Sequence, residues 1–283
     1  MDASKRSKIE SFVGLTNKNI GPNSVIFGDA ARQKVDVITT GSLKIDVATG
    51  IGGIPRGRIT EIYGGESSGK TSLSLQSAAN CQKNGGAVLY IDAENALDPS
   101  YAKALGVVLE DITFAQPDTA EESLTIAKNG LESGVFDLIV IDSVAALVPR
   151  AVLEGDIGDA HVGVLARLMS ANLPKIARAA AVSNTAIIMV NQTRSKIGIS
   201  YGDPTTTSGG VALKFYASMR IQTSRSTLRK DGEEVLGNTV KVKVVKNKLA
   251  APFKECEPEI VYGEGFSLER ELIDIGVEHD IVS

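Results

Sequence analysis

The sequence has few of the residues from which metal sites and disulfide frameworks are built. Its 283 residues include two cysteines, Cys81 and Cys256, and two histidines, His161 and His279. Neither pair has the spacing of metal ligands. We therefore predict neither a structural disulfide nor a catalytic thiol, and we expect Cys81 to be a small buried hydrophobe within a helix.

Long apolar runs are missing too. No segment approaches the roughly 18 apolar residues of a membrane-spanning helix, and residues 1–8 lack the apolar core of a signal peptide. We therefore expect no membrane partner and a cytoplasmic location. The chain is 43% hydrophobic and 23% charged, as is ordinary for globular proteins, and its length suits one large α/β domain or two small ones.

The net charge of −4 conceals an uneven distribution. Residues 214–254 contain ten Lys and Arg against three Asp and Glu, whereas residues 255–283 contain nine acids against one Arg. A basic segment followed by an acidic one suggests a polyanionic partner. Two solvated surfaces explain the same pattern, and charge alone favours them.

One motif is both present and specific. Glycines 64 and 69 bracket four residues and are followed by Lys70 and Thr71, which is the phosphate-loop pattern. Glycines let consecutive N–H groups point at phosphate oxygens, Lys70 supplies a positive charge, and Thr71 offers a hydroxyl to Mg²⁺. The flanks predict a strand before the loop and a helix after it, as the motif requires. We expect nucleotide contacts from Glu66, Ser67, Ser68, Gly69, Lys70, Thr71 and Ser72.

The pattern along the chain predicts an α/β fold. Short apolar runs typical of strands buried on both faces alternate with helical stretches. This alternation predicts a mainly parallel twisted sheet with helices on both faces, followed by an antiparallel hairpin at one edge. The predicted strands are 58–63, 87–91, 138–141 and 187–190; the helices are 72–79, 99–105, 120–131 and about 162–182; the hairpin strands are 218–223 and 239–245, joined by the polar stretch 225–237.

Three of the predicted strands end in polar residues, where ligands bind in such sheets. Asp142 follows an apolar strand and is expected to hold Mg²⁺ through water, although it could instead cap the next helix. Glu94 could orient and deprotonate an attacking water or be an acid at a helix N-terminus, and the sequence does not decide between them. Gln192 could sense the γ-phosphate and signal to the loop that follows it.

That loop, residues 193–210, is long and rich in glycine and threonine, and a connection of such length is usually functional or disordered. Arg194 and Lys196 at its start suit a phosphate backbone. A second glycine-bearing connection spans 154–163 and would by itself be an ordinary loop.

Distinctive runs of residues are spread over about 38–282, nearly the whole chain. They include 40–43, 61–64, 66–71, 90–94, 141–147, 155–159, 191–192, 212–218, 243–248 and 262–265. Taken together, these runs resemble those of bacterial-type RecA recombinases, which are ATP-dependent strand-exchange proteins.

The resemblance implies a role for each matching position. Glu94 would activate water for ATP hydrolysis, with Lys70, Gln192, Lys246 and Lys248 also catalytic and Mg²⁺ held by Thr71 and, through water, by Asp142. Asp98, Tyr101 and Tyr262 would contact the nucleotide. DNA contacts would come from Arg167, Arg194, Lys196, Ile197, Gly209 and Gly210.

The resemblance also implies a filament. Lys246 and Lys248 would reach the ATP of a neighbouring copy, as an arginine finger does elsewhere, and Phe215 would pack at the same interface. Without the resemblance, the two lysines could simply protect an edge strand. The expected division is a polymerisation segment at 1–35, an ATPase core at 36–270 with DNA-binding loops near 154–163 and 193–210, and the start of a truncated C-terminal region at 271–283.

Three functions are therefore open. The leading one is a DNA-dependent ATPase that forms filaments on single-stranded DNA and exchanges strands with duplex DNA. A non-catalytic filament subunit is the second, and a hexameric helicase or helicase loader is the third. One departure from relatives is Pro174, which lies in a predicted helix, should kink it, and stands where relatives often have a basic residue.

Overall fold

The computed structural model describes residues 1–21, 24–28, 35–156, 161, 163–195, 205–231, 234–278 and 280–282. It divides into two units, Met1–Asp36 and Val37–Ser283. In the first unit, helix α1 (Ala3–Ile20) begins where the Asp2 side chain accepts a hydrogen bond from the backbone N–H of Ser4. No residue of α1 is buried, and neither is any other described residue of this unit.

The second unit is built on one large sheet. Its described strands run in the order β13-β12-β10-β9-β3-β7-β6-β4-β5, and all pairs from β9 through β5 are parallel. Short runs rich in Val and Ile form the central strands, which confirms the predicted parallel sheet. These strands are β3 (Ile59–Gly64), β4 (Val88–Asp92), β5 (Ile112–Ala115), β6 (Leu138–Asp142) and β7 (Ala186–Ser195).

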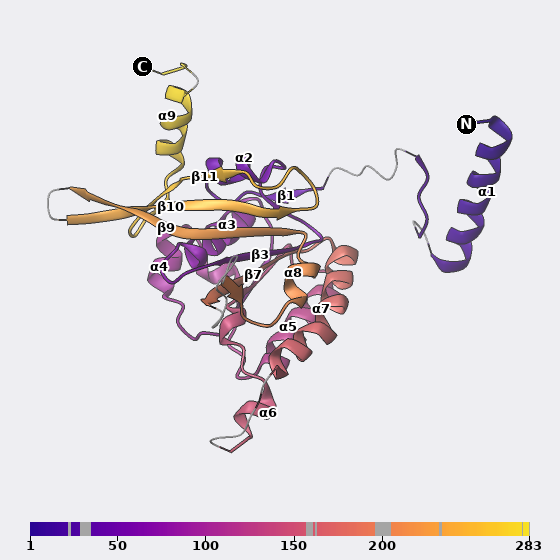
Figure 1. Cartoon of the computed structure of the whole chain (residues 1–283), viewed down its shortest axis with the longest axis horizontal. Helices are drawn as coiled ribbons and strands as arrows, with labels where there is room; N and C mark the ends of the chain where they lie inside the picture. The colour runs from indigo at the N-terminus through magenta and orange to yellow at the C-terminus, as the bar shows by residue number, and fades with distance from the viewer. Residues whose placement is uncertain are drawn as a thin grey trace. The chain divides into compact units, whose positions relative to one another are not determined.

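Helices cover both faces of this sheet because successive strand residues point to opposite sides. In β6, Leu138 and Val140 pack in the cluster that includes α3, whereas Ile139 and Ile141 pack with α5 and α7. Helices α5 and α7 lie side by side on their face (Figure 1). The helices of the unit are α2 (Leu43–Thr49), α3 (Lys70–Lys83), α4 (Pro99–Ala104), α5 (Ala120–Ser133), α6 (Arg150–Leu153), α7 (Val164–Ser183), α8 (Ala212–Tyr216) and α9 (Leu268–Glu278).

Helices α7 and α3 contain Pro174 and Cys81, for which the sequence made specific predictions. Helix α7 continues on both sides of Pro174, which is interior to it; the expected kink stays a prediction. Helix α3 contains Cys81, which is 3% exposed, as predicted, and both Cys81 and Cys256 are free thiols. Burial raises the pKa of Cys81 to about 11 and that of Cys256 to about 12, so neither is a ready nucleophile.

The antiparallel part of the sheet is larger than predicted. The sequence assigns a polar connection to 225–237, but β9 (Met219–Asp231) and β10 (Glu234–Asn247) extend into it as a long antiparallel pair, up to Asp231 and from Glu234 onward (Figure 1). The two strands pair with each other there, and a hydrophobicity pattern does not detect them because the segment is rich in polar residues. Further short strands follow β10, namely β11 (Glu255–Cys256), β12 (Glu259–Val261) and β13 (Gly265–Phe266).

The uneven charge is partly neutralised within this ribbon. Lys241 and Lys243 on β10 both form ion pairs with Glu255 on β11, at 2.9 and 2.6 Å. The two ammonium groups lower the pKa of Glu255 to about 2. Part of the basic segment is therefore paired with the acidic one that follows it.

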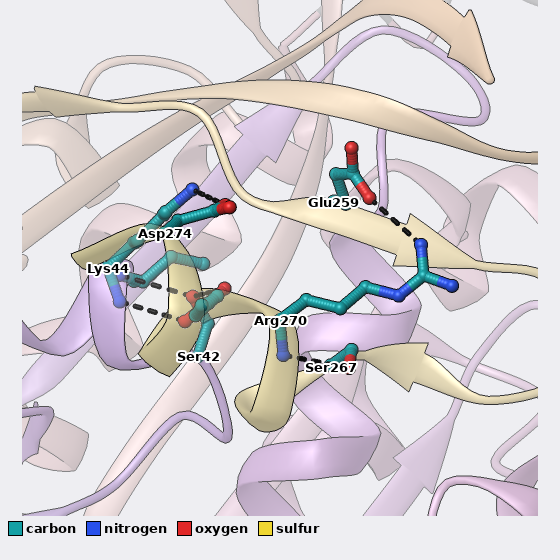
Figure 2. A network of polar contacts seen from close by, with 8 residues as sticks. Ser42, Lys44, Glu259, Ser267, Arg270 and Asp274 are labelled. Carbon is teal, nitrogen blue, oxygen red and sulfur yellow. Dashed lines mark hydrogen bonds and ion pairs between the residues drawn. The ribbon is translucent and has the colours of Figure 1, made fainter. Parts of the chain in front are cut away.

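Polar contacts fix α9 against α2 (Figure 2). The buried carboxylate of Glu271 accepts hydrogen bonds from Ser42 Oγ at 2.7 Å and from the backbone N–H of Lys44 at 2.9 Å. It therefore satisfies donors at the N-terminus of α2, where a negative charge is favourable. Lys44 Nζ also pairs with Asp274 at 2.7 Å.

A second ion pair in the same region joins Arg270 Nη1 to Glu259 Oε2 at 3.2 Å (Figure 2). It connects α9 to β12, so the helix is tied to two parts of the unit. In the part of the chain that the structure describes, no helix is long and apolar enough to cross a membrane.

Candidate nucleotide and DNA site

The loop between β3 and α3 needs its glycines. A Cβ at Gly64 would lie 2.1 Å from the carbonyl oxygen of Thr223, and one at Gly69 would lie 2.4 Å from Cδ1 of Ile260. Gly69 also has a φ of +81°, which side chains disfavour, and it immediately precedes α3. The result is a tight backbone cradle at a helix N-terminus, which suits a phosphate group.

Lys70 lies over this cradle. Its Nζ donates to the carbonyl oxygen of Gly65 at 2.6 Å, and Ser68 Oγ donates to the same oxygen at 2.8 Å. Burial lowers the pKa of Lys70, while nearby carboxylates oppose that shift. Glu66 and Ser67 are exposed on the outer part of the loop.

At the start of α3, Thr71 meets the carboxylate that ends β6. Thr71 Oγ1 and the Tyr90 hydroxyl both donate to Asp142 Oδ2, each at 2.9 Å. Asp142 is only 6% exposed, and burial raises its pKa against the lowering effect of these two hydrogen bonds. The hydrogen bonds of the Asp142 side chain therefore go to these two hydroxyls and not to the N-terminus of the following helix, which was the alternative role.

This donor set fits Mg²⁺. A hydroxyl and a single carboxylate are hard oxygen ligands, and Mg²⁺ typically binds through one or two carboxylates plus the phosphates of its substrate. Among the described residues no group of three or more His, Cys, Asp and Glu side chains could form an all-protein metal site. Thr71 and Asp142 beside the phosphate cradle are the residues that would hold the ion.

The ends of β4, β6 and β7 bring a third set of side chains together. Glu94 Oε1 accepts from Ser143 Oγ at 2.5 Å and from Gln192 Nε2 at 3.2 Å. Glu94 also shares a cavity of about 40 Å³ with Thr71 and Asp142. A carboxylate beside both a phosphate cradle and a metal ligand can orient a water molecule and accept its proton.

Sequence reasoning missed three residues that shape this site. Asp92, 3% exposed, accepts hydrogen bonds from the backbone N–H groups of Glu94 and Leu97, both at 3.1 Å, and so fixes the turn that presents Glu94. Ser143 and Tyr90 hold the two site carboxylates. Only Asp92 had a usable signal, because it ends a buried strand as Asp142 does.

The expected nucleotide contacts outside the loop have clear places in the fold. The Asp98 side chain accepts from the N–H of Ser100 at 2.8 Å and caps α4. The Tyr101 hydroxyl is 2.6 Å from Ser72 Oγ, so its side chain lies against the start of α3. Tyr262 is 51% exposed in the turn between β12 and β13.

The predicted DNA contacts are only partly described. Lys196 and Ile197 lie outside the described residues, as do 157–160, 162 and 198–204 of the two loops. Arg167 is exposed near the start of α7, and Arg194 is exposed at the end of β7, where its Nε donates to Ser208 Oγ at 3.1 Å.

Gly209 and Gly210 form the C-terminal end of the 193–210 loop. Both have positive φ, +81° and +79°, and a Cβ at Gly210 would lie 2.7 Å from Cβ of Ala166 on α7. Side chains are therefore excluded where this loop meets the helix. Strand β8 (Thr205–Thr207) pairs antiparallel with the end of β7 just before the two glycines.

A buried polar network built on a charge pair connects this loop to the phosphate-loop strand. Glu61 on β3, with no exposed surface, pairs with Arg220 on β9 at 2.5 Å, and the guanidinium lies 4.3 Å from the centroid of the Tyr63 ring. Asn191 Nδ2 donates to Glu61 Oε1 at 3.0 Å and to the carbonyl of Ser208 at 3.1 Å. Asn191 directly precedes Gln192.

The two lysines at the end of β10 converge on α8. Lys246 Nζ donates to the carbonyl oxygens of Lys214 and Phe215 at 2.5 and 3.1 Å, and Lys248 Nζ donates to that of Phe215 at 3.4 Å. Burial, followed by the nearby Lys248 charge, lowers the pKa of Lys246. The Phe215 side chain is 69% exposed.

Comparisons with known proteins agree with this geometry. The family described as RecA N-terminal domain matches residues 7–267. Protein RecA of Methylococcus capsulatus is 54% identical over 284 residues, covering 100% of this chain and 82% of the relative. Protein RecA of Thioalkalivibrio sulfidiphilus is 52% identical, with 100% and 83% covered, and that of Acidothermus cellulolyticus is 53% identical over 279 residues, with 98% and 81% covered. The match across the phosphate loop, the sheet and both loop regions leads to one conclusion, that the chain belongs to the RecA family.

Proposed function

We propose that the chain is a DNA-dependent ATPase that forms a helical filament on single-stranded DNA and catalyses homologous pairing and strand exchange with duplex DNA. The observation that carries the proposal is the contact between Gln192 and Glu94. It joins a carboxylate beside the phosphate cradle to the residue from which the 193–210 loop departs. Nucleotide state and DNA contact can therefore act on each other through one hydrogen bond.

The site residues divide the work of ATP hydrolysis. The cradle N–H groups and Lys70 bind the phosphates of ATP and stabilise negative charge as the γ-phosphoryl group leaves. Mg²⁺, when bound, supplies charge neutralisation between the phosphates. Thr71 and, through water, Asp142 would hold the ion, and Glu94 orients the attacking water and accepts its proton. Ser143 keeps the Glu94 carboxylate in place.

Coupling to DNA follows from the hydrogen bond between Gln192 and Glu94. When the γ-phosphate attracts Gln192, its amide leaves Glu94 and pulls on the loop that begins at Thr193. Arg194 and the glycines at 209 and 210 then place the loop against a DNA backbone, with Arg167 contributing from α7. Binding that depends on such phosphate contacts weakens steeply as salt increases.

Filament formation completes the site. We propose that Lys246 and Lys248 exchange the α8 carbonyls for the phosphates of ATP in a neighbouring copy, with Phe215 packing at that interface. The mobility of lysine and the shared carbonyl of Phe215 support this exchange. The 1–35 segment, whose helix buries none of its residues, would pack on another copy.

The test is ATP hydrolysis with and without single-stranded DNA, on the native chain and on Glu94→Gln. We expect strong stimulation by DNA and a loss of about a hundredfold or more in the variant, because the amide cannot accept a proton. Glu110→Gln, an exposed change outside the site, is the matched control and should behave as the native chain. ATP binding without DNA-stimulated hydrolysis would reject the proposal and favour the non-catalytic filament subunit.

A further inference from the structure

Tyr90 places a hydroxyl where the fold needs only an aromatic ring. The residue lies on β4, is 1% exposed, and stacks near Phe114 with 6.3 Å between ring centroids. A phenylalanine would fill the same space in the core. The buried hydroxyl costs free energy unless it is hydrogen-bonded, so its partner defines its purpose.

The protons around this hydroxyl can be assigned. Ser74 Oγ lies 3.3 Å from the Tyr90 oxygen, but Ser74 donates its single proton to the carbonyl of Thr71 at 2.9 Å. The Tyr90 proton goes to Asp142 Oδ2, which also accepts from Thr71 Oγ1. Within the described chain, Asp142 Oδ2 thus has two hydroxyl donors and Oδ1 has none.

We propose that Tyr90 is a positioning residue for Asp142 and sets the affinity of the nucleotide complex for its divalent cation. This inference rests on the proposed function. The phenol and Thr71 hold one carboxylate oxygen, which leaves the other for the hydration shell of Mg²⁺. A rigid ring in the core fixes that orientation at little entropic cost. Residues that orient metal-binding groups in this way typically contribute ten- to a hundredfold in metal affinity.

The test uses Tyr90→Phe in the full chain, with Mn²⁺ as the probe and adenosine diphosphate as the nucleotide. Free Mn²⁺ is measured by electron paramagnetic resonance, and nucleotide affinity is measured separately in EDTA. We expect Mn²⁺ to bind the nucleotide complex of the variant about tenfold more weakly. Nucleotide affinity without metal should not change. The Mg²⁺ concentration for half-maximal ATP hydrolysis should rise by a similar factor.

Ser74→Ala is the matched control, because it removes a hydroxyl beside the phenol but leaves the contact with Asp142. Equally weakened Mn²⁺ binding in both variants would show a general loosening of α3 and overturn the proposal. Native Mn²⁺ affinity in Tyr90→Phe would overturn it as well. A double-mutant cycle with Asp142→Asn gives a second measurement, in which the effect of Tyr90→Phe must disappear. Failure of the native chain to bind nucleotide at all would overturn the proposed function and this inference with it.

Discussion

Replacing Asp46 with Asn should change how the stability of the second unit depends on pH. Asp46 lies in α2 at 8% exposure, and its Oδ1 accepts from the backbone N–H of Thr40 at 3.0 Å. Burial, with a smaller contribution from the Glu271 charge, raises the pKa of Asp46 from 3.8 to about 6, and the contacts with Thr40 oppose the shift.

The sign and size of the effect follow from this shift. A carboxyl whose pKa is higher in the folded state binds its proton more tightly there. Its stabilisation is therefore complete below pH 3.8 and is lost as the pH rises through about 6. The pKa of about 6 in the folded state lies about 2.2 above 3.8, which corresponds to about 3 kcal/mol at 1.36 kcal/mol per pKa unit.

Asn has the same shape as Asp, can still accept from Thr40, and does not titrate. Urea unfolding followed by far-ultraviolet circular dichroism between pH 4 and 7.5 measures both proteins. We expect nearly equal stability at pH 4 and a variant that is more stable by up to about 3 kcal/mol at pH 7.5. Asp111→Asn, at an exposed position, is the control and should show no such trend. A difference between native protein and Asp46→Asn that is the same at both pH values would refute the reasoning.

Two further substitutions test the network and the cradle. Arg220→Met leaves Glu61 buried without its cation, so the free energy of unfolding should fall by about 3–5 kcal/mol. Adding Glu61→Gln should recover much of that loss, and a double variant no better than the single one would contradict the pairing. Gly69→Ala combines a positive φ, costing about 1–2 kcal/mol, with a Cβ that overlaps Ile260. Calorimetry should record weaker nucleotide binding as well as lower stability, and native affinity would contradict the cradle.

The central sheet was predictable because its signal is local. The runs at 88–92 and 138–142 are apolar up to a final carboxylate. The burial of each strand and its polar end can therefore be predicted from that segment alone. The phosphate loop is likewise contained in eight residues. These features depend on neighbours in sequence, which a pattern can detect.

The rest depends on which segments pair. Ser143 and Glu94 are 49 residues apart and meet only because β4 and β6 are neighbours in the sheet. Strands β9 and β10 are rich in polar residues where they enter 225–237, so they can be assigned there only from their pairing with each other. Within one chain Lys246 contacts the carbonyl oxygens of Lys214 and Phe215 in α8, and its expected contact with a neighbouring copy stays a prediction. No periodicity within one segment encodes such contacts.

The Glu61–Arg220–Asn191 network also restricts how this protein can evolve. Its members lie on three different strands, and the buried Glu61 carboxylate is held by both Arg220 and Asn191. Loss of either charged partner alone leaves the other uncompensated in the core, so single substitutions at these positions pass through a destabilised intermediate. The positions can therefore diverge among descendants only in combination or after stabilising changes elsewhere. The strand that leads into the phosphate loop and strand β9 are thus constrained to diverge together by one ion pair.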